Sequence, residues 1–225
     1  MATSFTLAKP QTHLEDPLVY LSSSRILEYR KGQVIYNQDQ PSTNICLVID
    51  GKVKVCRMAD DGRPVIVDIY QHEDFFGESA FLNSSTRGEQ AVALENTKVM
   101  TWTMAEIEEI VMRRPRLGVA LVQMLVRRSI EFAYRIESFS VNSVARRLGL
   151  GLIRLSERLG QNADDGSVQM MPFSHELLSQ YVGTSREVVT HFMNQFRRQG
   201  YLSYSRKGIF LRRDALKSWF EQQNA

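Results

Sequence analysis

The segment from residue 174 to residue 199 constrains the fold most strongly, because it encodes two short helices joined by a glycine. Ser174 suits the N-cap of the first helix and Ser185 that of the second, since a serine hydroxyl accepts a hydrogen bond from an unpaired N–H at a helix start. Gly183 lies between them, where a sharp turn favours a residue that tolerates positive φ. This pattern is typical of a helix-turn-helix, and an ordinary helical hairpin with a solvated polar face is the alternative.

The second of these helices carries apolar residues on one side and polar residues on the other. In a DNA-binding helix-turn-helix, the apolar side packs on the protein and the polar side enters the major groove. Arginine can donate a bidentate pair to guanine, glutamate can accept from cytosine, and hydroxyls near helix ends bind phosphate. The predicted packing residues are Val188, Val189, Phe192 and Phe196. The predicted base-reading residues are Arg186, Glu187, Thr190 and His191, and the predicted DNA-backbone contacts are Ser174, Thr184, Ser185 and Lys207.

A basic hairpin is predicted directly after the second helix. Two strand-like runs, 201–205 and 208–212, flank Lys207, which places basic side chains at the tip of a wing. The charge distribution agrees, because residues 141–225 hold 12 Lys/Arg against 7 Asp/Glu, whereas residues 1–140 hold 16 against 18. A basic C-terminal part joined to a slightly acidic N-terminal part fits a module that contacts DNA attached to one that does not.

The N-terminal part has the pattern of an antiparallel β-domain. From about residue 25 to residue 102, short β-branched or aromatic runs alternate with Gly- and Asp-containing turns. Many short strands at regular intervals predict an antiparallel sandwich or barrel. Examples of the predicted strands are 33–36, 45–49, 53–56, 65–70 and 98–102.

After Thr103 the pattern becomes helical. A short amphipathic helix is predicted over 104–114, and Pro115 suits the first turn of a longer helix. Along the longer helix, apolar residues recur at alternating spacings of 4 and 3, which is the pattern of a coiled-coil seam. We therefore predict a homodimer, and a helix packed only on its own domain is the alternative. The predicted seam consists of Val122, Leu125, Ser129, Phe132, Ile136 and Phe139.

A third helix is predicted over 144–160, followed by a polar loop over 161–167. The chain therefore divides into a β-roll sensor domain over 1–104, helices with a hinge over 105–143, and a winged helix-turn-helix domain over 144–225. The predicted fold class is α+β, with an N-terminal antiparallel β-roll of the jelly-roll type, a long coiled-coil dimerisation helix and a C-terminal winged helix-turn-helix.

Two motifs connect this architecture to a known family. The sequence VGTSREVV at 182–189 is similar to the start of the recognition helix in the CRP/FNR family of bacterial regulators, and FGES at 76–79 followed by Arg87 resembles the phosphate-binding cassette of cyclic-nucleotide domains. The resemblance covers nearly the whole chain. It implies that Arg186 and Glu187 read bases, that RNA polymerase is a partner, and that a small molecule such as a cyclic nucleotide controls the protein. The implied effector pocket consists of Gly77, Glu78, Ser79, Arg87, Gly88 and Phe132.

The chain departs from the family pattern at positions that matter for the effector. Gly88 and Glu89 stand where nucleotide binders commonly have a hydroxyl residue and alanine, so Glu89 would place a like charge near a phosphate. Phe132 stands where a hydroxyl residue contacts the purine, and His191 stands where a second base-reading arginine is found. The alternatives are a vestigial pocket in an effector-independent regulator and a Glu78 that pairs with Arg87.

Other classes of protein find little support in the sequence. No apolar run reaches the ~18 residues that cross a bilayer, and residues 1–11 do not resemble a signal peptide, so we expect a cytoplasmic location. Cys46 and Cys56 are expected to be small buried hydrophobes, because no metal-ligand or iron–sulfur spacing surrounds them. His13, His72 and Cys46 are the loose candidates for a haem ligand, but none belongs to a motif. With no catalytic constellation visible, we expect neither an enzyme nor a metal site.

Overall fold

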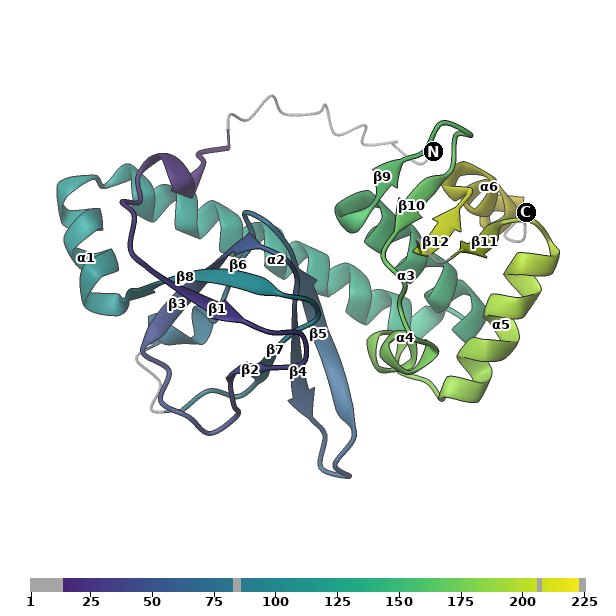
Figure 1. The fold of residues 1–225 in the computed structure, drawn as a ribbon, viewed down its shortest axis with the longest axis horizontal. Coiled ribbons are helices and arrows are strands. Elements are labelled where there is room, and N and C mark those ends of the chain that lie inside the picture. Colours follow the sequence, from purple (N-terminus) through teal and green to yellow (C-terminus); the bar gives the residue numbers. More distant parts are fainter. Residues whose placement is uncertain (1–13, 83–85, 206–207, 223–225) are drawn as a thin grey trace, which may run out of the picture.

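The protein is described by a computed structural model that covers residues 14–82, 86–205 and 208–222. In this described part, two four-stranded antiparallel sheets form the N-terminal half and a third belongs to the C-terminal half. Figure 1 shows the long helix α2 (Arg116–Val141) running along both halves and connecting them. The arrangement confirms the predicted order of a β-domain, a long helix and a helix-turn-helix.

The N-terminal half is a sandwich of two sheets, with strand orders β1-β8-β3-β6 and β2-β7-β4-β5. Buried residues of both sheets, Val48 and Val55 among them, meet in a common core. All five predicted strands are present, but β1, β6 and β7 were not predicted, because a run such as Gln90–Ala93 lacks β-branched alternation. The strands are β1 (Arg25–Tyr29), β2 (Val34–Tyr36), β3 (Asn44–Asp50), β4 (Val53–Met58), β5 (Pro64–Tyr70), β6 (Phe75–Phe76), β7 (Gln90–Ala93) and β8 (Thr97–Thr103); the 3-10 helices are η1 (Pro17–Val19) and η2 (Glu78–Leu82).

Helix α1 (Met104–Arg113) and the start of α2 cover one end of this sandwich (Figure 1). Thr103 caps α1 in a reciprocal capping box, in which the Glu106 carboxylate accepts from the Thr103 N–H at 2.7 Å. Pro115 is the residue before α2, one position earlier than the predicted first turn. Leu117 of α2 is fully buried in a cluster with Trp102. Neither α2 nor any other helix in the described residues is long and apolar enough to cross a membrane.

The C-terminal half packs four helices against a small sheet with the order β11-β12-β10-β9. The stretch 161–167 is not only a loop as predicted, because Gln161–Asn162 pairs with the following strand. The last helix, which was not predicted, approaches α3 at Gly149, where a Cβ would lie 2.2 Å from the Phe220 ring. The elements are α3 (Val144–Leu159), β9 (Gln161–Asn162), β10 (Val168–Met170), α4 (His175–Val182), α5 (Arg186–Arg198), β11 (Leu202–Ser205), β12 (Gly208–Leu211) and α6 (Arg213–Gln222).

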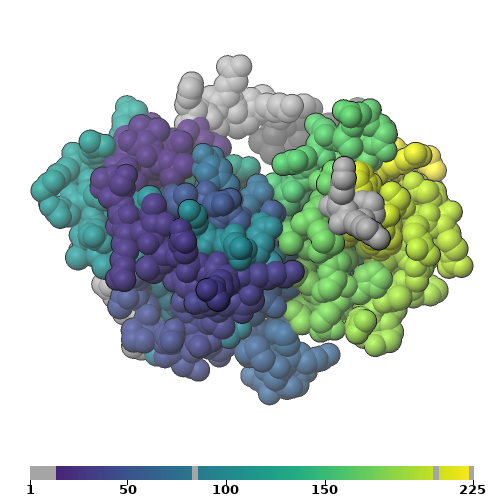
Figure 2. All heavy atoms as spheres, viewed as in Figure 1, coloured from purple at the N-terminus to yellow at the C-terminus, as the bar shows by residue number. Residues whose placement is uncertain are grey.

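The two halves are packed against each other (Figure 2), and β5 contacts α4 at their boundary. Ile66 and Ile69 of β5 are fully buried in the same hydrophobic cluster as Leu148 and Leu152 of α3. Beside this cluster, Gln71 Nε2 donates to the Arg158 carbonyl at 2.5 Å. The core of the C-terminal half therefore continues into the outer surface of the second sheet.

Candidate DNA interface and sensor pocket

The helix-turn-helix has the local geometry that the sequence predicts. Ser174 Oγ accepts from Leu177 N at 3.0 Å at the start of α4, and Ser185 Oγ accepts from Val188 N at 3.3 Å at the start of α5. Gly183 has φ 71° in the left-handed region, which glycine adopts without the steric penalty that a Cβ would bring. The Ser174 hydroxyl can still donate to a phosphate, because it uses only a lone pair in the cap, whereas the Ser185 hydroxyl also donates to the Glu187 carboxylate.

Helix α5 has one face buried and the other exposed. Val189, Met193 and Phe196 are fully buried, which fixes the helix on the protein. Arg186, Glu187 and His191 are exposed on the opposite side, near the N-terminus of the helix. Met193 was not among the predicted packing residues, although its position four residues after Val189 is the signal that would have found it.

Unlike the other predicted base-reading residues, Thr190 has its side chain engaged by neighbours within the protein. Its hydroxyl donates to the Arg186 carbonyl at 2.8 Å and also lies 2.8 Å from His175 Nδ1. His175 Nε2 is 3.4 Å from the Tyr204 hydroxyl, so this imidazole joins α4, α5 and the wing strand β11. Burial, and then the charge of Arg186, lower the pKa of His175. Sequence reasoning missed His175 because the link exists only across three elements.

Three of the four residues predicted to contact the DNA backbone lie in the described part of the chain. Thr184 is half-buried in the turn, whereas Ser174 and Ser185 are exposed. Lys207 lies outside the described residues.

The predicted sensor pocket gathers around Arg87, which is 4% exposed. Its Nη2 donates to the Asn44 carbonyl at 2.7 Å and its Nη1 donates to the Gly77 carbonyl at 3.3 Å. Its Cζ lies 3.9 Å from the centroid of the Tyr36 ring. The guanidinium that would neutralise a phosphate is therefore occupied by two carbonyls and an aromatic face.

Glu78 pairs with Arg128 of α2 and not with Arg87, so the alternative Glu78–Arg87 pair is wrong. The Arg128 Nη1 atom lies 2.9 Å from Glu78 Oε1, and Arg128 Cζ lies 4.7 Å from the Tyr70 ring centroid. Arg128 also donates to the Phe75 carbonyl. The sequence signal for Arg128 was its helical spacing after the apolar residues Leu117, Leu121 and Met124, which face the sheets.

The other residues of the implied pocket are held by neighbours or lie at its edge. Ser79 Oγ is 2.9 Å from Ser42 Oγ, and Gly88 is exposed. Burial, and then the charge of Glu78, raise the pKa of Glu89. Phe132 is half-buried on α2. The contacts of Arg87 would have to rearrange before this pocket could hold a cyclic phosphate.

The exposed apolar surface of α2 overlaps the predicted seam only in part. Of the predicted seam residues, Val122, Ile136 and Phe139 are exposed apolar side chains, Ser129 is exposed, and Leu125 and Phe132 are half-buried. The exposed apolar surface also includes side chains that the 4-3 pattern did not select. These are Val119, Val126, Ile130, Tyr134 and Val141.

The expectation that both cysteines are buried is confirmed. Cys46 and Cys56 are free and buried, and burial raises the pKa of Cys46 to about 12. His72 is exposed, with Nδ1 2.6 Å from the Ile49 carbonyl, and His13 lies outside the described residues. The described residues contain no group of three or more His, Cys, Asp or Glu side chains that could hold a metal.

A β-sandwich coupled by a long helix to a winged helix-turn-helix defines the class of DNA-binding transcription regulators. Residues 26–114 match the family model of the cyclic nucleotide-binding domain, and residues 146–219 match that of the Crp-like helix-turn-helix domain. The chain belongs to the CRP/FNR family of transcription regulators.

Individual relatives share the fold at low sequence identity. A "CRP-like cAMP-activated global transcriptional regulator" of Mycobacterium tuberculosis is 23% identical over 185 residues, which are 82% of this chain and 83% of the relative. A "Global nitrogen regulator" of Synechococcus elongatus is also 23% identical, over 82% of this chain and 84% of its own. The solved structure of FixK2 from Bradyrhizobium japonicum superposes with a TM-score of 0.76 at 23% identity and covers 88% of this chain and 97% of that one.

Proposed function

We propose that the protein binds a two-fold symmetric DNA site as a homodimer and regulates transcription there. One observation carries the proposal: α5 has its apolar side buried and its polar N-terminal side, with Arg186, Glu187 and His191, exposed. These are the side chains that can reach base edges in the major groove. Two such helices related by a two-fold axis would read half-sites about 34–36 Å apart. Thr190 contributes by holding Arg186 and His175 in place and not by reading a base.

The surface of α2 supports the homodimer. Large apolar side chains such as Val126, at 53% exposed, and Ile130, at 51%, lie on the long helix outside the core of their own chain. Parallel packing of two such helices would remove them from water and set the two copies of α5 on one side of the dimer. We also propose domain boundaries at 104/105 and 143/144.

The contacts of Arg87 support a β-domain that is not controlled by a cyclic nucleotide. A cyclic phosphate at this position would have to displace the Asn44 and Gly77 carbonyls from the guanidinium. The effector-independent alternative is therefore favoured for the β-domain. A titration with cyclic AMP and cyclic GMP, followed by calorimetry, tests this directly, and saturable binding that Arg87→Gln abolishes would contradict it.

Selection of bound DNA from a random pool tests the main proposal. The expected product is an inverted repeat, and Arg186→Ala should lose the preference at one position in each half-site. Selection of a single, asymmetric site would contradict the homodimer, and an unchanged site preference in Arg186→Ala would contradict the role of α5. We further propose a cytoplasmic location, RNA polymerase as a partner at the promoter, and no enzymatic activity.

A further inference from the structure

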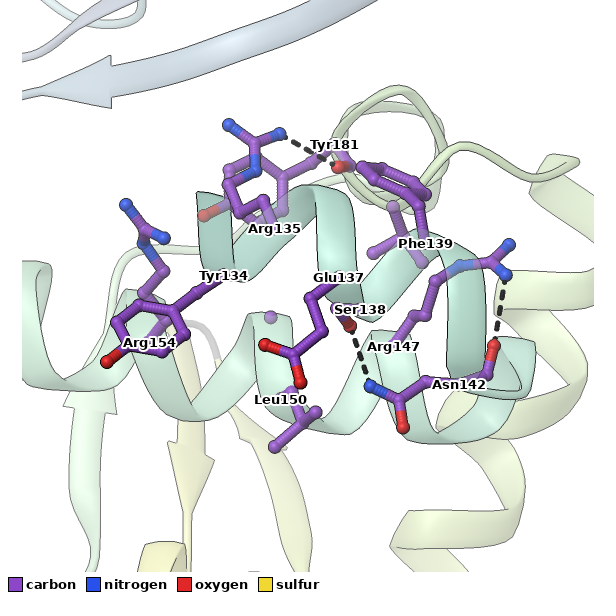
Figure 3. Close-up of a pocket in the computed structure, with 12 residues that line it drawn as sticks. Tyr134, Arg135, Glu137, Ser138, Phe139, Asn142, Arg147, Leu150, Arg154 and Tyr181 are labelled. Atoms are coloured by element: carbon purple, nitrogen blue, oxygen red, sulfur yellow. Dashed lines mark hydrogen bonds between the residues drawn. The ribbon is translucent and has the colours of Figure 1, made fainter. Parts of the chain in front are cut away.

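A cavity of about 340 Å³ lies where α2, α3 and α4 meet. Figure 3 shows Tyr134 and Arg154 at one end of the stretch of α2 that borders it, and Phe139 and Arg147 at the other. The cavity is separate from the sensor pocket around Arg87, because none of the residues that contact Arg87 lines it. Its volume lies within the range of small-molecule sites.

The charges around this cavity are unbalanced. Three guanidinium groups line it against one carboxylate, that of Glu137. Arg154 has an acidic partner, Glu131, at 2.7 Å, but among the described residues no carboxylate pairs with Arg135 or Arg147. An uncompensated positive charge at a partly enclosed site favours an anion.

The two guanidiniums that lack a carboxylate donate to main-chain carbonyls. Arg135 donates to the carbonyls of Ile66 at 3.0 Å and Tyr181 at 3.4 Å. Arg147 donates to the carbonyls of Asn142 at 3.2 Å and Gly183 at 3.4 Å, and its Nε is buried without a hydrogen-bond partner among the described residues. A carbonyl oxygen at 3.4 Å is a weak acceptor, so the Arg147 fork retains donor capacity for a carboxylate.

Much of the remaining lining is apolar or aromatic, beside the polar Ser138 and Asn142. Leu150 and Val182 line the cavity together with the Phe139 ring, whose centroid lies 5.4 Å from Arg147 Cζ. A ring of a ligand could lie against these side chains while its acidic group reaches Arg147. The lining therefore matches an aromatic acid better than an inorganic anion.

The same residues touch the turn of the helix-turn-helix. Arg147 bonds the Gly183 carbonyl, and Phe139 Cε1 lies 2.9 Å from the position that a Cβ on Gly183 would occupy. Gly183 separates α4 from α5, so anything that moves Phe139 or Arg147 also moves the turn that aims α5. The cavity is thus in mechanical contact with the DNA interface.

We propose that this cavity is a binding site for a small aromatic carboxylate, held by Arg147 and by the apolar surface of Leu150 and Val182, with Phe139, which also belongs to the predicted dimer seam, at its edge. The ligand would bridge the end of α2 and the helix-turn-helix and thereby change the position of α5. The binding site stands on the cavity alone, whereas the effect on α5 rests on the proposed DNA-binding function.

The test uses 1-naphthylacetate and its uncharged isostere 1-naphthylacetamide as probes, with the full-length protein in its solution oligomeric state and without DNA. We expect the acid to bind saturably by calorimetry, at one molecule per chain, and the amide to bind at least ~10-fold more weakly, because the amide lacks the charge-assisted hydrogen bonds. Arg147→Gln should weaken binding of the acid by a similar factor and leave binding of the amide unchanged. Arg127→Gln, which removes an exposed arginine of α2 outside the cavity, is the control and should bind the acid like the wild type.

Leu150→Trp should fill the cavity and abolish binding of both probes, and circular dichroism establishes that this variant is folded. Equal affinities for acid and amide, or acid binding that survives in both Arg147→Gln and a folded Leu150→Trp, would overturn the proposal. Failure of the wild type to bind the acid would also overturn it, and would indicate that a second copy of the chain or a side chain fills the cavity in solution. Binding of the acid without any change in DNA affinity would support the binding site and would contradict only its proposed effect on α5.

Discussion

Arg158 of α3 and Asp68 of β5 form an ion pair across the boundary between the two halves of the protein. Arg158 Nη1 lies 2.7 Å from both carboxylate oxygens of Asp68, which is 3% exposed, and Arg158 Nη2 lies 3.1 Å from Asp74 Oδ2. Arg158 also donates to the Ile69 carbonyl at 3.1 Å. This single guanidinium therefore connects the helix-turn-helix half to the β-sandwich through three residues.

Asp68→Asn should destabilise the contact between the halves. The substitution leaves the Arg158 charge with only Asp74 as a carboxylate partner, so we expect a loss of about 2 kcal/mol in the free energy of unfolding, less than the roughly 3–5 kcal/mol of a fully orphaned buried charge. Urea denaturation measures the loss, and limited proteolysis near 140–143 measures release of the halves. Asp61→Asn removes a half-exposed carboxylate that pairs only with nearby Arg63 and should change neither. Equal stability of the two variants would show that the ion pair does not hold the halves together.

Arg186→Ala should reduce specific DNA binding by about 1–3 kcal/mol and relax the preference at one base pair. Lys207→Ala should instead weaken binding to all DNA sequences alike. It should also reduce the slope of the logarithm of affinity against the logarithm of salt concentration by about one. Electrophoretic mobility or anisotropy titrations at several salt concentrations distinguish the two effects. If Arg186→Ala weakened specific and nonspecific DNA equally, Arg186 would be a phosphate contact and not a base contact.

Gly183→Ala should impair both stability and DNA binding. Alanine at φ 71° is strained, and its Cβ would lie 2.9 Å from Phe139 Cε1. We expect a loss of about 1–3 kcal/mol in the free energy of unfolding. Gly200→Ala is the matched control, because Gly200 has φ 78° but no atom within 4 Å of its Cβ position. The difference between the two variants measures the contact with Phe139, and identical losses would mean that this contact is easily relieved.

His175 should make stability depend on pH. Its pKa is lowered in the folded protein, by burial first and by Arg186 second, so the folded state favours the neutral imidazole. The stability that it contributes is fully present above the unfolded pKa of about 6.5 and is lost as the pH falls below that value through the lower folded pKa. The melting temperature of wild type should therefore fall more steeply than that of His175→Gln between about pH 7.5 and pH 5. Parallel pH profiles for the two proteins would contradict this assignment.

Val126→Glu should weaken the dimer. A carboxylate on the exposed apolar face of α2 would lie in the proposed interface between two helices, where burial of an unpaired charge is costly. We expect sedimentation to show a shift toward monomer, with at least a tenfold increase in the dissociation constant of the dimer. Met112→Glu, on a side chain of α1 that is 83% exposed, is the control and should leave the dimer intact. A dimer unaffected by Val126→Glu would move the interface to another part of the chain.

Local chemistry explains why much of the helix-turn-helix could be predicted. Serine caps, a glycine with positive φ and the 3.6-residue period each act within a few residues, so Ser174, Gly183 and Ser185 could be assigned from their neighbours along the chain. The same argument covers the longer strands, in which β-branched residues recur. Short strands such as Gln90–Ala93 escaped prediction, because they are stabilised by their partners across the sheet and not by their own composition.

The sequence by itself determined the longer elements, their order and the chemical character of the exposed face of α5, since these depend on local backbone preferences and on hydrophobic periodicity. Only the tertiary structure decided which charges meet. Arg87 turned toward main-chain carbonyls, Glu78 paired with Arg128, and Arg158 reached Asp68 from 90 residues away. The charged groups that pair are those that the fold brings close together and buries. The 3.6-residue periodicity of a helix contains no information about either distance in space or burial.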